Sequence, residues 1–212
     1  MKKQIKLSKG TNYGILHNTF NNLSTWIIIS SNALGLFLAY NQKLGVLTIM
    51  WVYWIESIII GLFNFVNILT LKDFSTENFE FNNQPVRNSN QKIQVAFFFL
   101  FHYGLFHIIY AGFLLFSKIF LRLGKVSIKS LMLISLVYFL NHALSFAFYK
   151  IKIKTKENIG KLMFRPYLRI IPIQLFLSFS AFLSFFSIPL FFLLKTVAEV
   201  LLQAFDNYKN SK

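Results

Sequence analysis

The sequence predicts an all-α integral membrane protein, a helical bundle of about six transmembrane helices with both termini in the cytoplasm. Hydrophobic residues make up 55% of the 212-residue chain and charged residues 14%, against about a quarter charged in soluble domains. The apolar residues are gathered in runs long enough to cross a bilayer. Basic residues are concentrated between alternate runs, which is the bias that sets membrane topology.

Six apolar runs are expected to cross the membrane. Because lipid offers no partner to unpaired backbone groups, each run should be α-helical. The last apolar stretch continues from Pro166 to Phe205. At 1.5 Å per residue it is too long for one crossing, so we divide it just before Pro189. Pro166 suits a first helical turn and starts the fifth span. The predicted spans are residues 24–40, 44–71, 93–120, 130–149, 166–186 and 189–205.

The membrane domain, residues 24–206, lies between a basic cytoplasmic arm (1–23) and a short tail (207–212). Segments on the side of both termini carry fifteen Lys and Arg residues, and the opposite segments carry five. This asymmetry places both termini in the cytoplasm. The arm lacks the apolar core of a signal peptide, so the first span is expected to direct insertion. The expected location is the cell membrane, the inner membrane in a bacterium.

The composition also limits the partners. A formal net charge of +15 would indicate nucleic-acid binding in a soluble protein. Here the bases flank apolar runs, so the expected partner is a bilayer with anionic headgroups, and nucleic acid is not expected. The chain has no cysteine, which excludes disulfides, thiolate metal sites and cysteine nucleophiles. A solute pathway through six spans would favour a homo-oligomer.

Glu56 is the most unusual residue of the second span, within "WVYWIESIIIGLFNFVNIL". An isolated carboxylate at that depth costs at least ~2.5–3.5 kcal/mol. It must therefore be protonated, paired, bound to a metal or exposed to water. Other ionisable residues lie near the same depth in other spans, and meeting in one place would let them satisfy one another. The predicted polar cluster contains Glu56, His102, His107, His142, Lys195 and Glu199.

Several of these residues also have an ordinary structural explanation. Lys195 and Glu199 are four positions apart and can form an ion pair within one helix. His102 and His107 are five positions apart and do not share a helix face, so a histidine there can simply be a packing residue. Basic and aromatic residues at the start of the fifth span are expected to contact headgroups. These interface residues are Arg165, Tyr167 and Arg169.

Five motifs occur in order from the second span onward: "YWIESIIIGLFN", "HYGLFH", "NHALSF", "RPYLRI" and "LLKTVAE". With them the chain resembles an uncharacterised multi-pass membrane protein family, domain of unknown function 6498. The resemblance supports the intramembrane residues as a set and implies no activity. Two positions depart from the family pattern. Glu199 stands where an Asp is expected, and Gln174 stands where a His is expected, which weakens a metal site.

Three functions remain open. The first is an intramembrane metal site on Glu56, His102 and His142, with a divalent metal such as zinc activating water, as in a hydrolase. The chain has no HExxH motif to support it. The second is a small-solute or proton-coupled transporter, for which Glu, His and Lys at mid-depth are suitable groups. The third is a structural or accessory membrane subunit. Enzyme status is open, and no catalytic residue is assigned.

Overall fold

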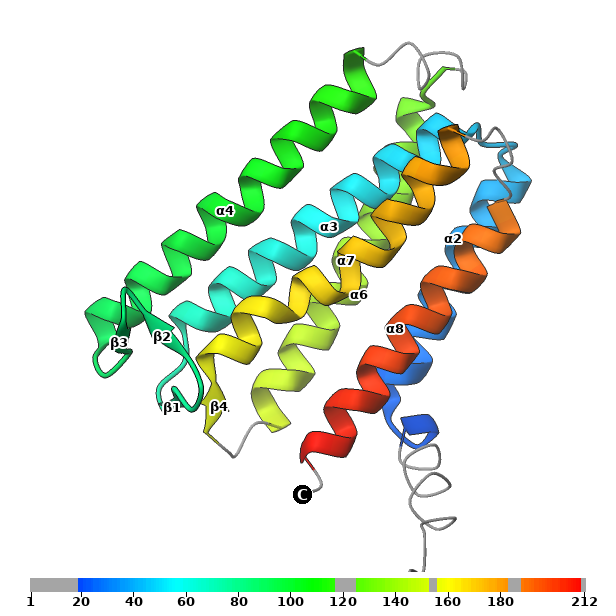
Figure 1. Ribbon diagram of the computed structural model, residues 1–212. Helices are drawn as coiled ribbons and strands as arrows, with labels where there is room; N and C mark the ends of the chain where they lie inside the picture. The colour runs from blue at the N-terminus through cyan, green and yellow to red at the C-terminus, as the bar shows by residue number, and fades with distance from the viewer. Residues whose placement is uncertain (1–18, 117–124, 153–155, 183–187, 211–212) are drawn as a thin grey trace, which may run out of the picture.

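The structure is a computed structural model, and it describes residues 19–116, 125–152, 156–182 and 188–210. Within these ranges the chain forms a bundle of six long helices with four short strands at one end (Figure 1). The helical class predicted from the sequence is confirmed. The helices are α2 (Leu23–Asn41), α3 (Val46–Leu69), α4 (Ser89–Phe116), α6 (Ile128–Lys152), α7 (Ile159–Phe182) and α8 (Ile188–Asn210).

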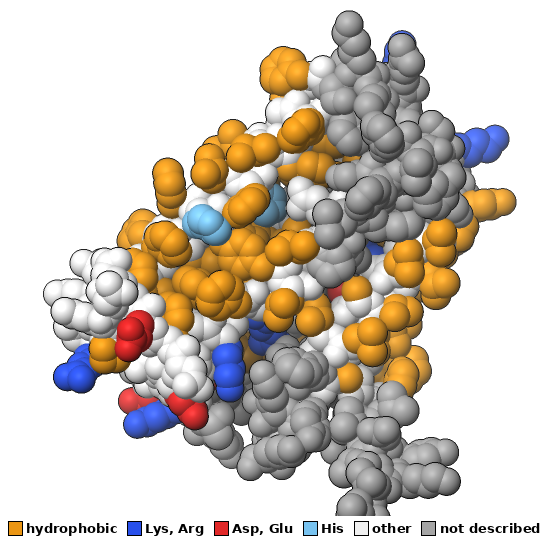
Figure 2. Space-filling view, viewed as in Figure 1, with side chains coloured by type: hydrophobic (Ala, Val, Ile, Leu, Met, Phe, Trp, Pro, Cys, Tyr) orange, Lys and Arg blue, Asp and Glu red, His pale blue; other side chains and the backbone are white. Residues whose placement is uncertain are grey.

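Four of these helices, α2, α3, α4 and α6, are long and apolar enough to cross a membrane, judged by length and composition. Helix α3 lies at the centre and contacts α4, α6 and α7. In the 18-residue apolar stretch of α3, 56% of the residues are buried, compared with 11% in that of α6. Helix α2 packs against α8 and α6. On the face drawn in Figure 2, hydrophobic side chains spread over much of the described surface.

Helix α4 begins earlier than predicted, at Ser89 instead of residue 93. A reciprocal capping arrangement explains the difference. The Asn88 side-chain oxygen accepts from the Gln91 backbone N–H at 2.8 Å. The Gln91 side-chain oxygen in turn accepts from the Arg87 backbone N–H at 2.7 Å. The polar residues Ser89, Asn90 and Gln91 therefore belong to the helix, although they precede its apolar run.

Helix α7 also begins earlier than predicted, so Pro166 lies in its interior and not in its first turn. A proline there has no N–H to donate to the carbonyl four residues back, which is that of Leu162. The Asn64 side-chain amide of α3 donates to this carbonyl instead, at 2.9 Å. The bond compensates for the proline and joins α3 to α7. The predicted division before Pro189 agrees with the end of α7 and the start of α8.

Four two-residue strands lie in segments for which the sequence predicted no strands. β1 (Phe74–Ser75) pairs in parallel with β4 (Glu157–Asn158). β2 (Glu80–Phe81) forms an antiparallel hairpin with β3 (Gln84–Pro85). The hairpin turn residues Asn82 and Asn83 both have positive φ, 53° and 58°, the conformation that a tight hairpin requires and asparagine tolerates. The β1–β4 pairing links the α3–α4 and α6–α7 connections at one end of the bundle (Figure 1).

Candidate functional site

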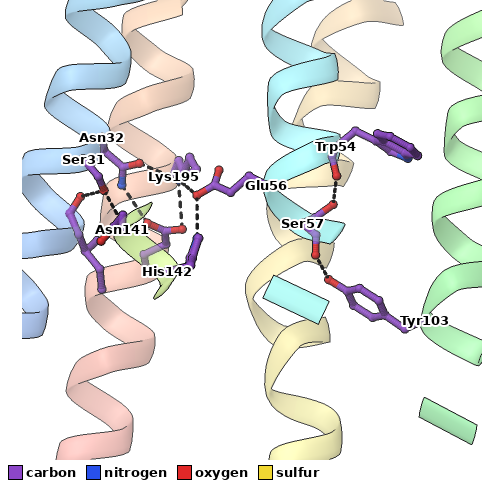
Figure 3. Close-up of polar contacts among 11 residues, drawn as sticks. Ser31, Asn32, Trp54, Glu56, Ser57, Tyr103, Asn141, His142 and Lys195 are labelled. Atoms are coloured by element: carbon purple, nitrogen blue, oxygen red, sulfur yellow. Dashed lines mark hydrogen bonds and ion pairs between the residues drawn. The ribbon is translucent and has the colours of Figure 1, made fainter. Parts of the chain in front are cut away.

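Lys195 on α8 lies at the centre of a buried polar network. Its Nζ donates to Asn32 Oδ1 at 2.6 Å, to Glu56 Oε1 at 2.9 Å and to Glu199 Oε1 at 3.1 Å. The ammonium therefore uses all three of its N–H groups. Asn32 also donates to Glu199 Oε2 at 2.9 Å, which closes a ring of contacts between α2 and α8 (Figure 3).

His142 on α6 completes this network, which we call the Lys195 network: Asn32, Glu56, His142, Lys195 and Glu199. His142 Nε2 lies 3.4 Å from Glu56 Oε1, the oxygen that also accepts from Lys195. The neighbouring Asn141 donates to Ser31 Oγ at 2.8 Å and joins α6 to α2. Four helices thus contribute to one site.

The three charged side chains of the network are buried. Lys195 is 1% exposed, Glu56 2% and Glu199 4%. A charge buried this deeply needs an opposite charge and hydrogen bonds, because desolvation otherwise disfavours it by several kcal/mol. The two carboxylates and Asn32 supply both to the ammonium. Lys195 Nζ also lies 4.8 Å from the centre of the Tyr138 ring, within the range of a cation–π contact.

Close helix packing around Gly35 on α2 brings the network together. A Cβ atom at this position would lie 2.5 Å from Tyr138 Oη and 2.8 Å from the Phe192 ring. Any larger residue would force the Tyr138 and Phe192 side chains to shift, so the glycine lets them pack directly against α2. The i,i+4 spacing of Lys195 and Glu199 then directs both side chains to the same face of α8, toward α2 and α3.

His107 was predicted in the same cluster, but the structure places it in a separate contact between α3 and α4. Its Nδ1 donates to the Tyr103 carbonyl at 2.8 Å, and its Nε2 lies 2.6 Å from Ser57 Oγ, which is also 2.8 Å from the Trp54 carbonyl. Trp54 Nε1 donates to the His107 carbonyl at 2.9 Å, and Tyr103 Oη donates to the Ser57 carbonyl at 2.8 Å. These bonds fasten α4 to α3.

His102 lies outside both groups. Its side chain is exposed, stacks on Phe98 and has Nδ1 2.8 Å from Tyr167 Oη on α7. Tyr167, predicted at the interface, is half-buried in this contact. Arg165, also predicted there, lines a cavity described below. The Arg169 side chain lies outside the described residues.

The residues that the structure describes do not fit the predicted zinc site on Glu56, His102 and His142. Among them no group of three or more His, Asp and Glu side chains is placed to hold a metal ion. His102 is bonded to Tyr167. Moreover, Glu56 Oε1 already accepts from the Lys195 ammonium, whose charge would oppose a divalent cation at the same oxygen.

A cavity of about 200 Å³ adjoins the network. The cavity extends from the network toward one end of the bundle. At this end α3 and α8 finish and α2 begins (Figure 1). Its walls come from α2, α3, α6, α7 and α8 and mix amide, hydroxyl and charged groups with aromatic rings. The lining includes Ser24, Ile28, Glu56, Ile60, Phe63, Asn64, Asn67, Asn141, His142, Ser145, Phe146, Tyr149, Arg165, Pro166, Glu199, Leu202 and Gln203.

A second, much smaller cavity of about 10 Å³ lies on another side of the network. Apart from Glu56 and Lys195, its lining is aliphatic and aromatic and includes Tyr53, Tyr138 and Phe192. Glu56 lines both cavities. Glu56 therefore lies between the two cavities, and Lys195, its ion-pair partner, lines the smaller one.

Comparison with known proteins supports the resemblance seen in the motifs. The family described as "Family of unknown function (DUF6498)" matches residues 15–212. The chain belongs to the DUF6498 family. No curated protein and no solved structure matches it. The DUF6498 match spans every residue of the Lys195 network and of the polar cavity.

Sequence reasoning missed several polar residues of this DUF6498 protein. Asn32 forms hydrogen bonds with both Lys195 and Glu199 of α8. Ser57 contacts His107, and Asn64 donates to the carbonyl that Pro166 leaves without a backbone donor. All three are uncharged residues within apolar runs. Their low cost of insertion gave no reason to expect a partner, although amides and hydroxyls in spanning helices commonly bond across helices.

Proposed function

We propose that this DUF6498 protein is a multi-pass membrane protein with six spans and a cytoplasmic N- and C-terminus. Four helices have the length and composition to cross a membrane. The charged residues in the middle of α8, Lys195 and Glu199, are buried in the bundle and do not face its surface. The start of α2, the end of α8 and the strands lie at one end (Figure 1), the end that carries most of the bases.

The function that the site supports best is proton-coupled transport of a small polar solute. The observation that carries the proposal is the position of the Lys195 network, at the inner end of a polar cavity and against a nearly filled apolar core. A carrier needs a solute site near the middle of the membrane and a closure that can open on the far side. The network supplies the closure.

The charge balance of the network supports a role for a proton. Glu56 and Glu199 bring two negative charges, and Lys195 brings one positive charge. One excess negative charge in a buried site is unfavourable, and a proton on His142 or on a carboxyl group neutralises it. Glu56 contacts Lys195 on α8 and His142 on α6. Asn32 on α2 bonds Lys195 and Glu199. The other titratable groups that line a cavity together with Glu56 are Glu199, Tyr53, Tyr138, Tyr149 and Arg165.

In the proposed cycle, a proton that enters through the cavity passes from His142 to Glu56. A neutral Glu56 attracts Lys195 less, while Glu199 and Asn32 keep their contacts with the ammonium. The Glu56–Lys195 contact beside the two cavities is then weakened. Return of the proton restores the Glu56–Lys195 pair and closes the site.

Proteoliposomes that contain a trapped pH-sensitive dye test this proposal. Glycine, glucose, methylguanidinium and succinate would be added separately, as a zwitterion, a neutral sugar, a cation and a dianion. At least one of them is expected to change the internal pH faster than in empty liposomes. Glu56→Gln is expected to lower that rate at least tenfold.

Glu80→Gln is the matched control, because Glu80 is an exposed glutamate in strand β2 and should leave the rate unchanged. The proposal fails if none of the four solutes moves protons above the background of empty liposomes. It also fails if the Glu56→Gln protein, shown to be monodisperse and folded, transports as fast as the original. In either case the structural role of the polar network becomes the better explanation.

A further inference from the structure

We propose that the solute is a small organic amine, bound in its ammonium form in the polar cavity beside Glu56. This inference rests on the proposed function for its role in transport. The binding site itself depends on the hydrogen-bonding capacity, the charge and the size of the cavity that the described residues form.

The cavity residues offer acceptors that lack donors. Among the described residues, Glu56 Oε2, Asn67 Oδ1 and Asn141 Oδ1 are buried and have no hydrogen-bond partner. All three residues line the cavity. Each of the two asparagine amide groups already donates one N–H, to Tyr149 Oη and to Ser31 Oγ. Unpartnered buried acceptors are costly, and a ligand rich in N–H donors would satisfy them.

The Lys195 ammonium is not available to an anionic solute. All three N–H groups of Lys195 donate within the network. Arg165 lines the cavity but also has an interaction of its own. The excess negative charge of the network attracts a cation instead. An ammonium group beside Glu56 would neutralise that charge in place of a proton, which couples the solute to proton movement.

The size and the aromatic wall favour an organic cation. A volume of about 200 Å³ is below the range of about 300–1,000 Å³ typical of sites for drug-sized ligands. Phe63 and Phe146 line the cavity with their ring centres 5.3 Å apart. Aromatic faces attract ammonium groups and also pack against the apolar part of an alkylamine.

Thermal unfolding of the detergent-purified full chain tests this inference with n-butylammonium, n-butanol and butyrate, which share a chain length and differ in charge. Butylammonium is expected to raise Tm with a half-saturating concentration at least tenfold below that of the other two. Glu56→Gln is expected to raise the half-saturating concentration of butylammonium at least tenfold, and Glu80→Gln is expected to leave it unchanged. Should the Glu56→Gln protein fail to fold, Phe63→Leu is the second variant, and it should weaken the binding of butylammonium more than the binding of butanol.

Equal effects of butylammonium and butanol, or a stronger effect of butyrate, would overturn the amine site. An equal shift with sodium chloride at the same ionic strength would also overturn it, in favour of an inorganic cation. Proton movement driven by glycine, glucose or succinate, with no butylammonium binding, would contradict this inference and leave the transport proposal standing. Butylammonium binding without proton movement by any solute would support the amine site and contradict the transport proposal.

Discussion

At the residue scale, the site depends on a small set of side chains that each have a specific partner. Glu56 was expected to need a partner because a lone carboxylate is unfavourable in lipid. The structure gives it Lys195 at 2.9 Å. The sequence placed Lys195 in the same predicted cluster as Glu56 but did not single it out, since a proton, a metal or water could also have satisfied the carboxylate. The role of Asn32 could not, because an uncharged amide carries no comparable penalty.

Two glycines provide a matched test of the packing around the network. Gly35→Ala is expected to destabilise the protein by about 1–3 kcal/mol, because the new Cβ would overlap Tyr138 and Phe192. Gly104→Ala is the control, since a Cβ there meets nothing within 4 Å among the described residues. Unfolding in mixed micelles measures both. Equal effects of the two substitutions would contradict close packing at Gly35.

At the element scale, the positions of the helices could be predicted well and their mutual rotation could not. Long apolar runs located all six described helices. The predicted and observed starts differ most for α4, which Asn88 caps, and for α7, which begins at Ile159. The histidines of α4 show what was missing. Which of His102 and His107 faces α3 depends on the rotation of α4 about its axis, and that rotation is decided by packing against Trp54 and Ser57.

The link between α3 and α7 can be tested with a pair of substitutions. Asn64→Leu is expected to cost about 1–3 kcal/mol, because it leaves the Leu162 carbonyl unbonded beside Pro166. In a Pro166→Ala background the restored N–H can bond that carbonyl, so the same Asn64→Leu change should cost less. Unfolding of the four proteins measures the difference. An identical cost in both backgrounds would show that Asn64 does not compensate for the proline.

At the scale of the whole molecule, the account requires the β1–β4 end of the bundle to face the cytoplasm. The count of Lys and Arg in the connecting segments predicted this orientation, and pairing of β1 with β4 brings two of the segments predicted to be cytoplasmic to one end. The strands themselves could not be predicted, because two-residue pairings between segments far apart in sequence leave no periodic pattern.

Because the chain contains no cysteine, single cysteines can report its topology. Thr76→Cys, beside β1, is expected to resist a membrane-impermeant maleimide in intact cells and to react after permeabilisation. Lys43→Cys, in the exposed connection between α2 and α3, is expected to react in intact cells. The reverse labelling pattern would invert the topology and place the mouth of the cavity on the outer side.

The central claim is that charges deep in the bundle are stable because they meet inside the protein, at Lys195. A double-mutant cycle with Glu56→Gln and Lys195→Met measures this most directly, as the free energy of unfolding of the four proteins in micelles. The account predicts that the two effects are not additive, with a coupling energy of at least about 1 kcal/mol. Additivity within about 0.5 kcal/mol would show that the two residues do not interact, and the proposed closure of the cavity would not exist.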